Sequence, residues 1–286
     1  MKGIILAGGN GTRLYPTTQI QNKCLLPVYD KPMIYYPLCT LIENGVNDIC
    51  IISSPEHINN YKKILINIPH IGINICYKTQ KKPEGIAQSF LIAKNFIKGE
   101  KVALILGDNI FSGGGRVLKR AFHNFRSGGI IFGYEVRDPE RYGVINFKKS
   151  GGVMSVSEKP KEPSSNYAVP GLYIFDESVL EYAKKITPSE RGELEITSVI
   201  NLYVANDKLK AFKLNRGCAW LDAGTPKSLH ESSEYIKVIE ERQGIKIGCV
   251  EEAAYNKKLI TKKELSEIAA KMPDSDYKEY LERISS

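Results

Sequence analysis

A glycine-rich turn near the N-terminus has the residue types that hold a polyphosphate. The chain reads Leu-Ala-Gly-Gly-Asn-Gly-Thr-Arg over residues 6–13. Glycine lets the backbone turn sharply and bring its N–H groups close to phosphate oxygens, and Arg13 adds a planar guanidinium for those oxygens. No Gly-Lys-Ser/Thr follows, and Leu14 stands where a dinucleotide fingerprint has its third glycine. The turn therefore indicates a phosphate cradle of another type, and the alternative is a tight turn after a strand.

Two acidic residues beside glycines are candidates for a divalent metal site. Asp108 lies in Leu-Gly-Asp-Asn, and Asp222 lies in Trp-Leu-Asp-Ala-Gly-Thr. Mg²⁺ is held in proteins by one or two carboxylates together with water and substrate phosphates. Each residue alone is also typical of a turn or a helix cap. Their joint role depends on whether the fold brings them together.

A carboxylate and a lysine at the end of one predicted strand suit a sugar phosphate. In Glu158-Lys159-Pro160, Lys159 can hold a monophosphate while Glu158 accepts hydrogen bonds from hydroxyls, and the alternative is a solvated strand end. Lys23 supplies a further cation soon after the glycine-rich turn. Trp220 is expected in the core or in a pocket wall.

The sequence contains no evident catalytic base. Its four histidines show no triad or metal-ligand spacing, and no nucleophile elbow occurs. A phosphate monoester, with a second pKa of about 6, is already a nucleophile near neutral pH. A reaction in which such a group attacks needs alignment and charge neutralisation more than proton abstraction.

The elements that position these residues read as an α/β protein. Apolar runs at 3–7 and 102–106 predict buried parallel strands. Ligands bind outside the carboxyl ends of such strands, so we expect the glycine-rich turn and Asp108 at the same edge. Further strands are expected at 48–54, 73–77, 129–136, 144–147, 153–156, 168–175 and 209–214, and helices at 33–44, 59–65, 86–97, 178–185, 193–205, 225–244 and within 259–284.

Length and composition predict a cytoplasmic globular protein. The 286 residues are 42% hydrophobic and 25% charged, which is ordinary for a soluble domain. No run reaches membrane length and no signal-peptide pattern is present. The net charge of +8 is spread without the aromatic interleaving of a nucleic-acid platform. Six cysteines without a C-x-x-C pair indicate neither disulfides nor a zinc site.

Motifs along nearly the whole chain resemble the sugar nucleotidyltransferase family, and within it the thymidylyltransferases that act on glucose 1-phosphate. In chain order they are Leu-Ala-Gly-Gly-x-Gly-Thr-Arg-Leu, Lys23 before Leu-Leu-Pro-Val-Tyr-Asp-Lys-Pro-Met-Ile-Tyr-Tyr-Pro-Leu, Gly-Ile-Ala-Gln, Leu-Gly-Asp-Asn, Asp-Pro-Glu-Arg-Tyr-Gly-Val, Glu-Lys-Pro, Asn-Tyr-Ala-Val, Arg-Gly-Glu-Leu-Glu-Ile-Thr and Ala-Trp-Leu-Asp-x-Gly-Thr.

The resemblance implies a Rossmann-like nucleotidyltransferase fold, with a mixed, mainly parallel central sheet flanked by helices. It further implies a nucleotidyltransferase domain over residues 1–244, with its nucleotide-binding part at about 1–125 and a β-rich sugar-binding part at about 126–225. A C-terminal helical appendage would follow at 245–286.

The implied activity is Mg²⁺-dependent transfer of a thymidylyl group from dTTP to α-D-glucose 1-phosphate, giving dTDP-glucose and pyrophosphate. The sugar phosphate would attack the α-phosphorus in line with the leaving pyrophosphate. The resemblance also implies a homotetramer, feedback by a dTDP-deoxysugar, and a place in dTDP-rhamnose and polysaccharide synthesis.

Residue roles carried over from the resemblance fall into four groups. The catalytic residues would be Arg13, Lys23, Asp108, Lys159 and Asp222, of which Asp108 and Asp222 would bind the metal. The nucleotide would contact Gly8, Gly9, Gly11, Thr12, Arg13, Gln80 and Gly85. The sugar would contact Asn109, Tyr142, Gly143, Glu158, Lys159 and Val169.

Four departures from the family pattern leave the substrate open. Cys24 stands where a glutamine is usual and Pro170 where a threonine is usual, Ser198 replaces an aspartate, and Ser-Gly-Gly-Gly at 112–115 replaces Tyr-Gly-His-Gly. The same chemistry with UTP or a modified hexose 1-phosphate is therefore an alternative. A non-catalytic sugar-nucleotide sensor is a more distant one, against which the cations and carboxylates named above argue.

Overall fold

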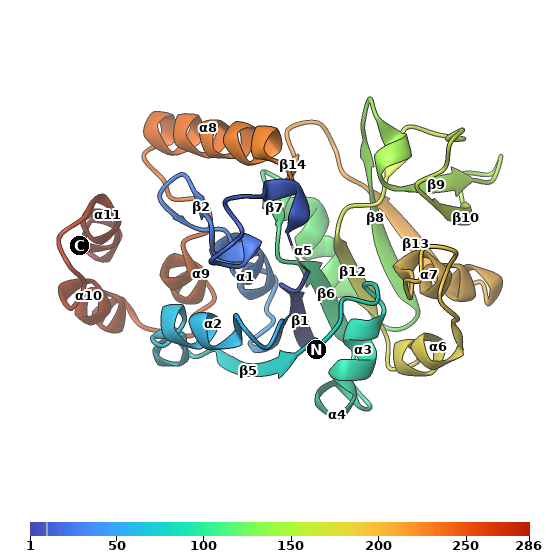
Figure 1. Cartoon of the computed structure of the whole chain (residues 1–286). Helices are drawn as coiled ribbons and strands as arrows, with labels where there is room; N and C mark the ends of the chain where they lie inside the picture. Colours follow the sequence, from blue (N-terminus) through green and yellow to red (C-terminus); the bar gives the residue numbers. More distant parts are fainter. Residues whose placement is uncertain (10) are drawn as a thin grey trace.

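A mixed β-sheet forms the centre of the computed structural model, which describes residues 1–9 and 11–286 (Figure 1). Within those residues the sheet has ten strands in the order β10-β9-β11-β8-β12-β6-β1-β4-β5, with β13 paired to β8. The strands are β1 (Lys2–Leu6), β4 (Asp48–Ser53), β5 (Asn74–Thr79), β6 (Val102–Leu106), β8 (Gly129–Glu135), β9 (Gly143–Phe147), β10 (Val153–Glu158), β11 (Tyr167–Ala168), β12 (Leu172–Phe175) and β13 (Leu209–Lys213).

The half of the sheet that carries the glycine-rich turn is parallel, as predicted. Strands β6, β1, β4 and β5 run in the same direction, and Leu6 is paired with Ile52 on one side and Leu106 on the other. The backbone N–H of Gly107 donates to the Leu6 carbonyl at 2.9 Å. The turns that follow β1 and β6 therefore leave the sheet at the same edge, which confirms the expectation for Asp108.

The other half of the sheet is antiparallel. Strand β12 pairs antiparallel with both β6 and β8, and β9, β10 and β11 continue the antiparallel pattern. The mixed α/β fold is thus confirmed, with parallel pairing confined to the β6–β5 half and the β8–β13 pair. The single strand predicted at 168–175 is interrupted at 169–171, because Pro170 has no N–H to donate and Val169 donates to the Gly143 carbonyl instead.

Alternate residues of the central strands face two separate hydrophobic cores. On β1, Ile5 belongs to the core on the α1 side, and Ile4 belongs to the core on the α3 and α7 side. The helices are α1 (Tyr35–Glu43), α2 (Ile58–Ile64), α3 (Gln88–Ile92), α4 (Lys94–Ile97), α5 (Gly115–Asn124), α6 (Val179–Lys185), α7 (Ile196–Ala205), α8 (Pro226–Gln243), α9 (Val250–Asn256), α10 (Lys262–Ala270) and α11 (Asp276–Ser285).

Several elements differ from the sequence-based expectation. The helix predicted at 86–97 is divided at Ala93 into α3 and α4. Helices α5 and α9 were not predicted, and neither were the short strands β7 (Asn109–Ser112) and β14 (Ala219–Asp222), which pair with each other. A two-stranded hairpin of β2 (Pro27–Val28) and β3 (Lys31–Pro32) also appears.

The C-terminal helices α9, α10 and α11 join the core on the α1 side. Their buried residues include Ala253, Leu265 and Leu281, and Figure 1 shows α10 and α11 at the opposite end of the molecule from β9 and β10. In the part of the chain that the structure describes, no helix is long and apolar enough to span a membrane. The division into a domain at 1–244 and an appendage at 245–286 stays a prediction.

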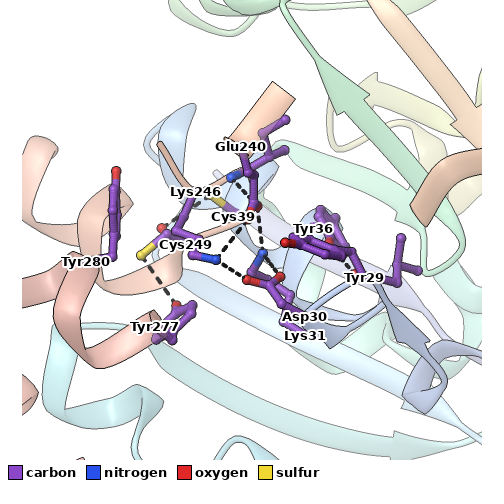
Figure 2. A network of polar contacts seen from close by, with 12 residues as sticks. Tyr29, Asp30, Lys31, Tyr36, Cys39, Glu240, Lys246, Cys249, Tyr277 and Tyr280 are labelled. Carbon is purple, nitrogen blue, oxygen red and sulfur yellow. Dashed lines mark hydrogen bonds and ion pairs between the residues drawn. The ribbon is translucent and has the colours of Figure 1, made fainter. Parts of the chain in front are cut away.

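A partly buried charge cluster, made of the buried Lys31 and Glu240 and the more exposed Asp30 and Lys246, links the β2–β3 hairpin to the end of α8 (Figure 2). The Lys31 Nζ lies 2.9 Å from Glu240 Oε1, and the Lys246 Nζ lies 3.0 Å from Glu240 Oε2. Both lysines also contact Asp30, and the backbone N–H of Ile247 donates to Glu240 at 2.8 Å. Two acids and two lysines thus neutralise one another in a site where a lone charge would be costly.

Candidate active site

One pocket of about 380 Å³ gathers most of the residues predicted to do chemistry. It lies where β6, β10 and β14 end, and the first turns of α7 close one side. Its lining residues are Arg13, Ile86, Leu106, Asp108, Asn109, Arg141, Tyr142, Gly143, Glu158, Lys159, Val169, Gly171, Tyr173, Ile196, Thr197, Ile200, Trp220 and Asp222. All six residues predicted for the sugar are among them.

The two predicted metal ligands come together although 114 positions separate them in the sequence. Strand β14 pairs antiparallel with β7, and the register places Asp222 opposite Asn109. The N–H of Ala223 donates to the Asp108 carbonyl at 3.1 Å. Both carboxylates line the pocket.

The two carboxylates have different electrostatic surroundings. Burial opposes ionisation of Asp108, but its ion pair with Lys23 and a hydrogen bond from Asn109 hold its pKa below the usual value. Burial and the nearby Asp108 charge raise the pKa of Asp222 to about 6. Among the described residues, no side chain or backbone N–H donates to the Asp222 carboxylate. The charges of Lys23, Arg13 and Arg141 only partly offset this rise of the Asp222 pKa, so a bound cation would further stabilise the charged carboxylate.

This donor set fits Mg²⁺. Among the described residues, no group of three or more histidine, cysteine or acidic side chains forms a ready-made metal cage. Mg²⁺ does not need one, because it binds through one or two carboxylates and keeps its remaining positions for water and substrate phosphates. Asp108 and Asp222 would be the protein ligands.

Arg13 reaches the same side of the pocket from the glycine-rich turn. It lies in a short 3₁₀ helix, Thr12–Leu14, that begins after Gly11 in a left-handed conformation (φ 57°). Gly224 lies between Arg13 and Asp222. A Cβ at position 224 would lie 2.8 Å from Arg13 Nη2 and 2.9 Å from Asp222 Oδ1. The Arg13 guanidinium and the Asp222 carboxylate are thus close neighbours.

Glu158, the last residue of β10, and Lys159, which follows it, also line the pocket. Burial and the neighbouring Glu195 raise the pKa of the Glu158 carboxyl, while Lys159 and Arg191 oppose the rise. Arg191 Nη1 lies 3.5 Å from an oxygen of each of the two acids, Glu158 and Glu195. Lys159 has a positive φ of 42°, and its backbone N–H donates to the Tyr142 carbonyl at 3.0 Å.

The side chain of Asn109 is held in place by hydrogen bonds to three neighbours in the pocket. Its Oδ1 accepts the indole N–H of Trp220 at 2.6 Å and the backbone N–H of Gly171 at 2.9 Å, and its amide donates to Asp108 at 3.0 Å. Trp220 also packs edge to face against Tyr142, with ring centroids 5.0 Å apart. Trp220 therefore forms part of the pocket wall, as expected.

Most of the residues predicted to bind the nucleotide lie outside this pocket. Gly8 and Gln80 adjoin each other, since a Cβ on Gly8 would lie 2.3 Å from the Gln80 Oε1. Gly85 packs against the backbone of Leu194, since a Cβ on Gly85 would lie 2.4 Å from the Leu194 carbonyl oxygen. Beside Gly9 the described part of the chain leaves open space. Asn10, within the predicted turn, lies outside the described residues, and Gly8, Gly9, Gly11, Thr12, Gln80 and Gly85 do not line the pocket.

Sequence reasoning missed two cations at the pocket. Arg141 lines it and also donates to Asp138 at 2.6 Å, and Arg191 contacts Glu158. Both stand inside motifs that carried the family resemblance, Asp-Pro-Glu-Arg-Tyr-Gly-Val and Arg-Gly-Glu-Leu-Glu-Ile-Thr. Those motifs were the available signal. Lys23, which was predicted, does not line the pocket and acts on it through Asp108.

The four departures from the family pattern lie at different places. The Cys24 side chain is buried, and a Cβ on Gly107 would lie 2.6 Å from its Sγ. Pro170 stands between the pocket residues Val169 and Gly171. Ser198 does not line the pocket, although its neighbour Thr197 does. The 112–115 stretch follows β7 and leads into α5.

A family model described as "Nucleotidyl transferase" matches residues 2–238. A glucose-1-phosphate thymidylyltransferase from Xanthomonas campestris is 48% identical over 98% of this chain and 95% of its own length. The enzyme of that name from Mycobacterium tuberculosis is 47% identical over 98% of each chain.

Solved structures agree with the sequence comparisons. A candidate glucose-1-phosphate thymidylyltransferase from Bacillus anthracis, solved with sucrose, superposes with a TM-score of 0.76 and 41% identity, covering 82% of this chain and 94% of its own. A UDP-glucose pyrophosphorylase complexed with UDP-glucose superposes with a TM-score of 0.73 and 25% identity, covering 83% of this chain and 98% of its own. The chain belongs to the nucleotidyl transferase family.

Proposed function

We propose that this chain is a glucose-1-phosphate thymidylyltransferase, which converts dTTP and α-D-glucose 1-phosphate into dTDP-glucose and pyrophosphate. One observation carries the proposal. A single pocket is lined by two groups of residues, Arg13 with Asp108 and Asp222, and Glu158 with Lys159. The first group suits a nucleoside triphosphate and the second suits a sugar phosphate. Relatives that carry this name, at 44–48% identity over nearly the full length, support the choice.

The sugar phosphate would bind at the Glu158 side. The Glu158 carboxylate would accept hydrogen bonds from sugar hydroxyls, and Lys159 would pair with the phosphate. Asn109 would orient the sugar, since its side chain is already fixed by Trp220 and Gly171. The ionised phosphate needs no base, which agrees with the absence of histidine, cysteine and serine from the described residues that line the pocket.

The reaction is an in-line displacement at the α-phosphorus of the nucleotide. An oxygen of the sugar phosphate forms a new P–O bond while the bond to the bridging oxygen of pyrophosphate breaks. Arg13 would neutralise charge that develops toward the leaving group, and Lys23 would hold Asp108 ionised and in place. Gly8, Gly9, Gly11 and Thr12 would hold the triphosphate, and Gln80 and Gly85 would contact the base.

We assign Mg²⁺ to Asp108 and Asp222. Bound there, the ion would neutralise phosphate oxygens as a Lewis acid. The Asp222 carboxylate, whose pKa burial and Asp108 raise to about 6, is the group whose charge such an ion would relieve.

Pyrophosphate release tests the proposal directly. The purified chain would be assayed with dTTP or UTP, each against glucose 1-phosphate and other hexose 1-phosphates, with the sugar nucleotide identified by mass spectrometry. We expect dTTP with glucose 1-phosphate to give the highest kcat/KM. Higher turnover with UTP would favour the alternative, to which the similarity to UDP-glucose pyrophosphorylase lends support. Release with none of the pairs would favour a sugar-nucleotide sensor.

Assembly and regulation follow from the same assignment. We propose a homotetramer that a dTDP-deoxysugar inhibits, and a place in dTDP-rhamnose synthesis. Light scattering coupled to size exclusion tests the first, since it reports the molar mass of the assembly directly. Inhibition assays with the deoxysugar nucleotide test the second.

A further inference from the structure

Asn22, next to the glycine-rich turn, has a buried amide nitrogen that finds no partner among the described residues. The residue is 2% exposed, and its Nδ2 makes no hydrogen bond to any described residue. Buried polar groups in native proteins are almost always satisfied, so an orphaned donor calls for an acceptor that the free chain lacks. Leaving such a group unpaired destabilises the fold.

The orientation of this amide is fixed by its own oxygen. Asn22 Oδ1 accepts the backbone N–H of Cys24 at 2.9 Å and the Tyr61 hydroxyl at 2.7 Å. A flipped amide would place two hydrogens against the Cys24 N–H, so exchanging oxygen and nitrogen is not an option. The Nδ2 is therefore the atom left without a partner.

Asn22 lies where the polyphosphate cradle is assembled. It precedes Lys23, whose ammonium pairs with Asp108, and it caps the short 3₁₀ helix that presents Lys23. Tyr61, which donates to Asn22, also lies 3.4 Å from the carbonyl of Ala7, the residue before the glycine-rich turn. At the other end of the glycine-rich turn, a Cβ on Gly11 would lie 3.5 Å from the Cβ of Lys23, the residue after Asn22. Asn22 is thus linked to both ends of the turn.

We propose that Asn22 is a nucleotide-binding residue whose amide donates to an oxygen of the bound polyphosphate, held in place for this by Tyr61. The inference rests on the proposed function, since it takes its ligand to be a nucleoside triphosphate. The polyphosphate would supply an anionic acceptor for a buried donor that has no acceptor among the described residues.

Binding of dTTP measured by calorimetry without sugar phosphate tests this. Asn22→Ser keeps an oxygen that can cap the Cys24 N–H but removes the amide donor. We expect its Kd for dTTP to rise by about tenfold or more, as for a lost hydrogen bond to a charged group. Its KM for glucose 1-phosphate and its kcat at saturating dTTP should change less than threefold. Tyr61→Phe, which leaves the amide in place, should raise the Kd by a smaller factor.

Asn44→Ser is the matched control, because Asn44 is a partly buried asparagine at the end of α1 whose amide already donates to the Thr40 carbonyl. It should bind dTTP as the wild type does. If Asn22→Ser does not fold, the nearly isosteric Asn22→Asp supplies the test, with a larger expected loss because a carboxylate would face the phosphates. A folded variant at position 22 that binds dTTP within twofold of the wild type would overturn the inference. A wild type that binds neither dTTP nor UTP would instead overturn the proposed function.

Discussion

Asp222 stands opposite Asn109 in the antiparallel β7–β14 pair, and this register brings its carboxylate to the same pocket as Asp108. A shift of one residue would turn Asp222 to the other face of the strand. The candidate metal site therefore depends on a short strand pair at the edge of the main sheet.

Gly224 is required to be small. An alanine there would put its Cβ 2.8 Å from Arg13 Nη2 and 2.9 Å from Asp222 Oδ1, so both catalytic side chains would have to move. We expect Gly224→Ala to lower kcat/KM in the pyrophosphate-release assay by about tenfold or more, since small displacements of catalytic groups can cost about 10²-fold. Gly115→Ala, where the described chain leaves open space, should leave activity unchanged. Equal activities of the two variants would refute this.

Arg13 should matter to turnover rather than to folding. Removing one preorganised contact to developing charge costs on the order of 10²-fold in rate. Arg13→Ala is therefore expected to lose about that factor in kcat while its melting temperature stays close to that of the wild type. Arg116→Ala, at an exposed position at the start of α5, is the control. Near-normal kcat for Arg13→Ala would count against the assignment.

The Trp220 indole should tune the affinity for the sugar phosphate. Its N–H donates to Asn109 at 2.6 Å, and phenylalanine removes that donor while keeping an aromatic wall. We predict a rise of about three- to tenfold in the KM for glucose 1-phosphate, as for one neutral hydrogen bond, with the KM for dTTP unchanged. Tyr235→Phe removes a hydroxyl 3.4 Å from Ser112, outside the pocket, and should change neither constant. A rise confined to the dTTP constant would contradict this role.

The partly buried charge cluster gives a pH-dependent contribution to stability (Figure 2). Burial opposes the charge on Asp30, but hydrogen bonds from Lys246 and Lys31 hold its pKa below the ordinary 3.8. A depressed pKa stabilises the fold above the unfolded value, and this stabilisation is lost as the pH falls through the folded value. Because Asp30 is partly screened by solvent, Asp30→Asn should cost about 1–2 kcal/mol at pH 7, with the difference from wild type shrinking below pH 3.8.

Urea unfolding at several pH values measures this contribution. Glu231→Gln, which breaks an exposed pair between Lys227 and Glu231 on α8, should change the free energy of unfolding by less than about 1 kcal/mol. A difference for Asp30→Asn that grows on acidification would show that the sign is wrong.

The parts of the fold predicted best from the sequence are those with two buried faces. Strand β6 was predicted at its observed bounds, and β1 within one residue, because a buried parallel strand is apolar throughout. The parallel arrangement of these two strands led to the prediction that the glycine-rich turn and Asp108 lie at the same edge of the sheet, which the structure confirms. Strand β7 was missed because its first residues, after Gly-Asp, look like a polar turn.

Local sequence patterns could not predict how segments far apart in the chain pair with each other. Nothing in the sequence fixes the register of β14 against β7, since that register depends on packing between segments more than 100 residues apart. Arg141 ends a three-residue 3₁₀ helix, Pro139–Arg141, and Arg191 lies in a loop before α7. In such short or irregular segments no periodicity separates a pocket arginine from a solvated one. The family resemblance, rather than any spacing, pointed to their motifs.

The central claim is that Asp108 and Asp222 act together on one nucleotide. It is tested most directly by pyrophosphate release from dTTP and glucose 1-phosphate, compared between the wild type and Asp222→Asn at saturating Mg²⁺. We predict that the variant stays folded and loses about 10²-fold or more in kcat. A folded Asp222→Asn variant that releases pyrophosphate within threefold of the wild-type rate would contradict the account.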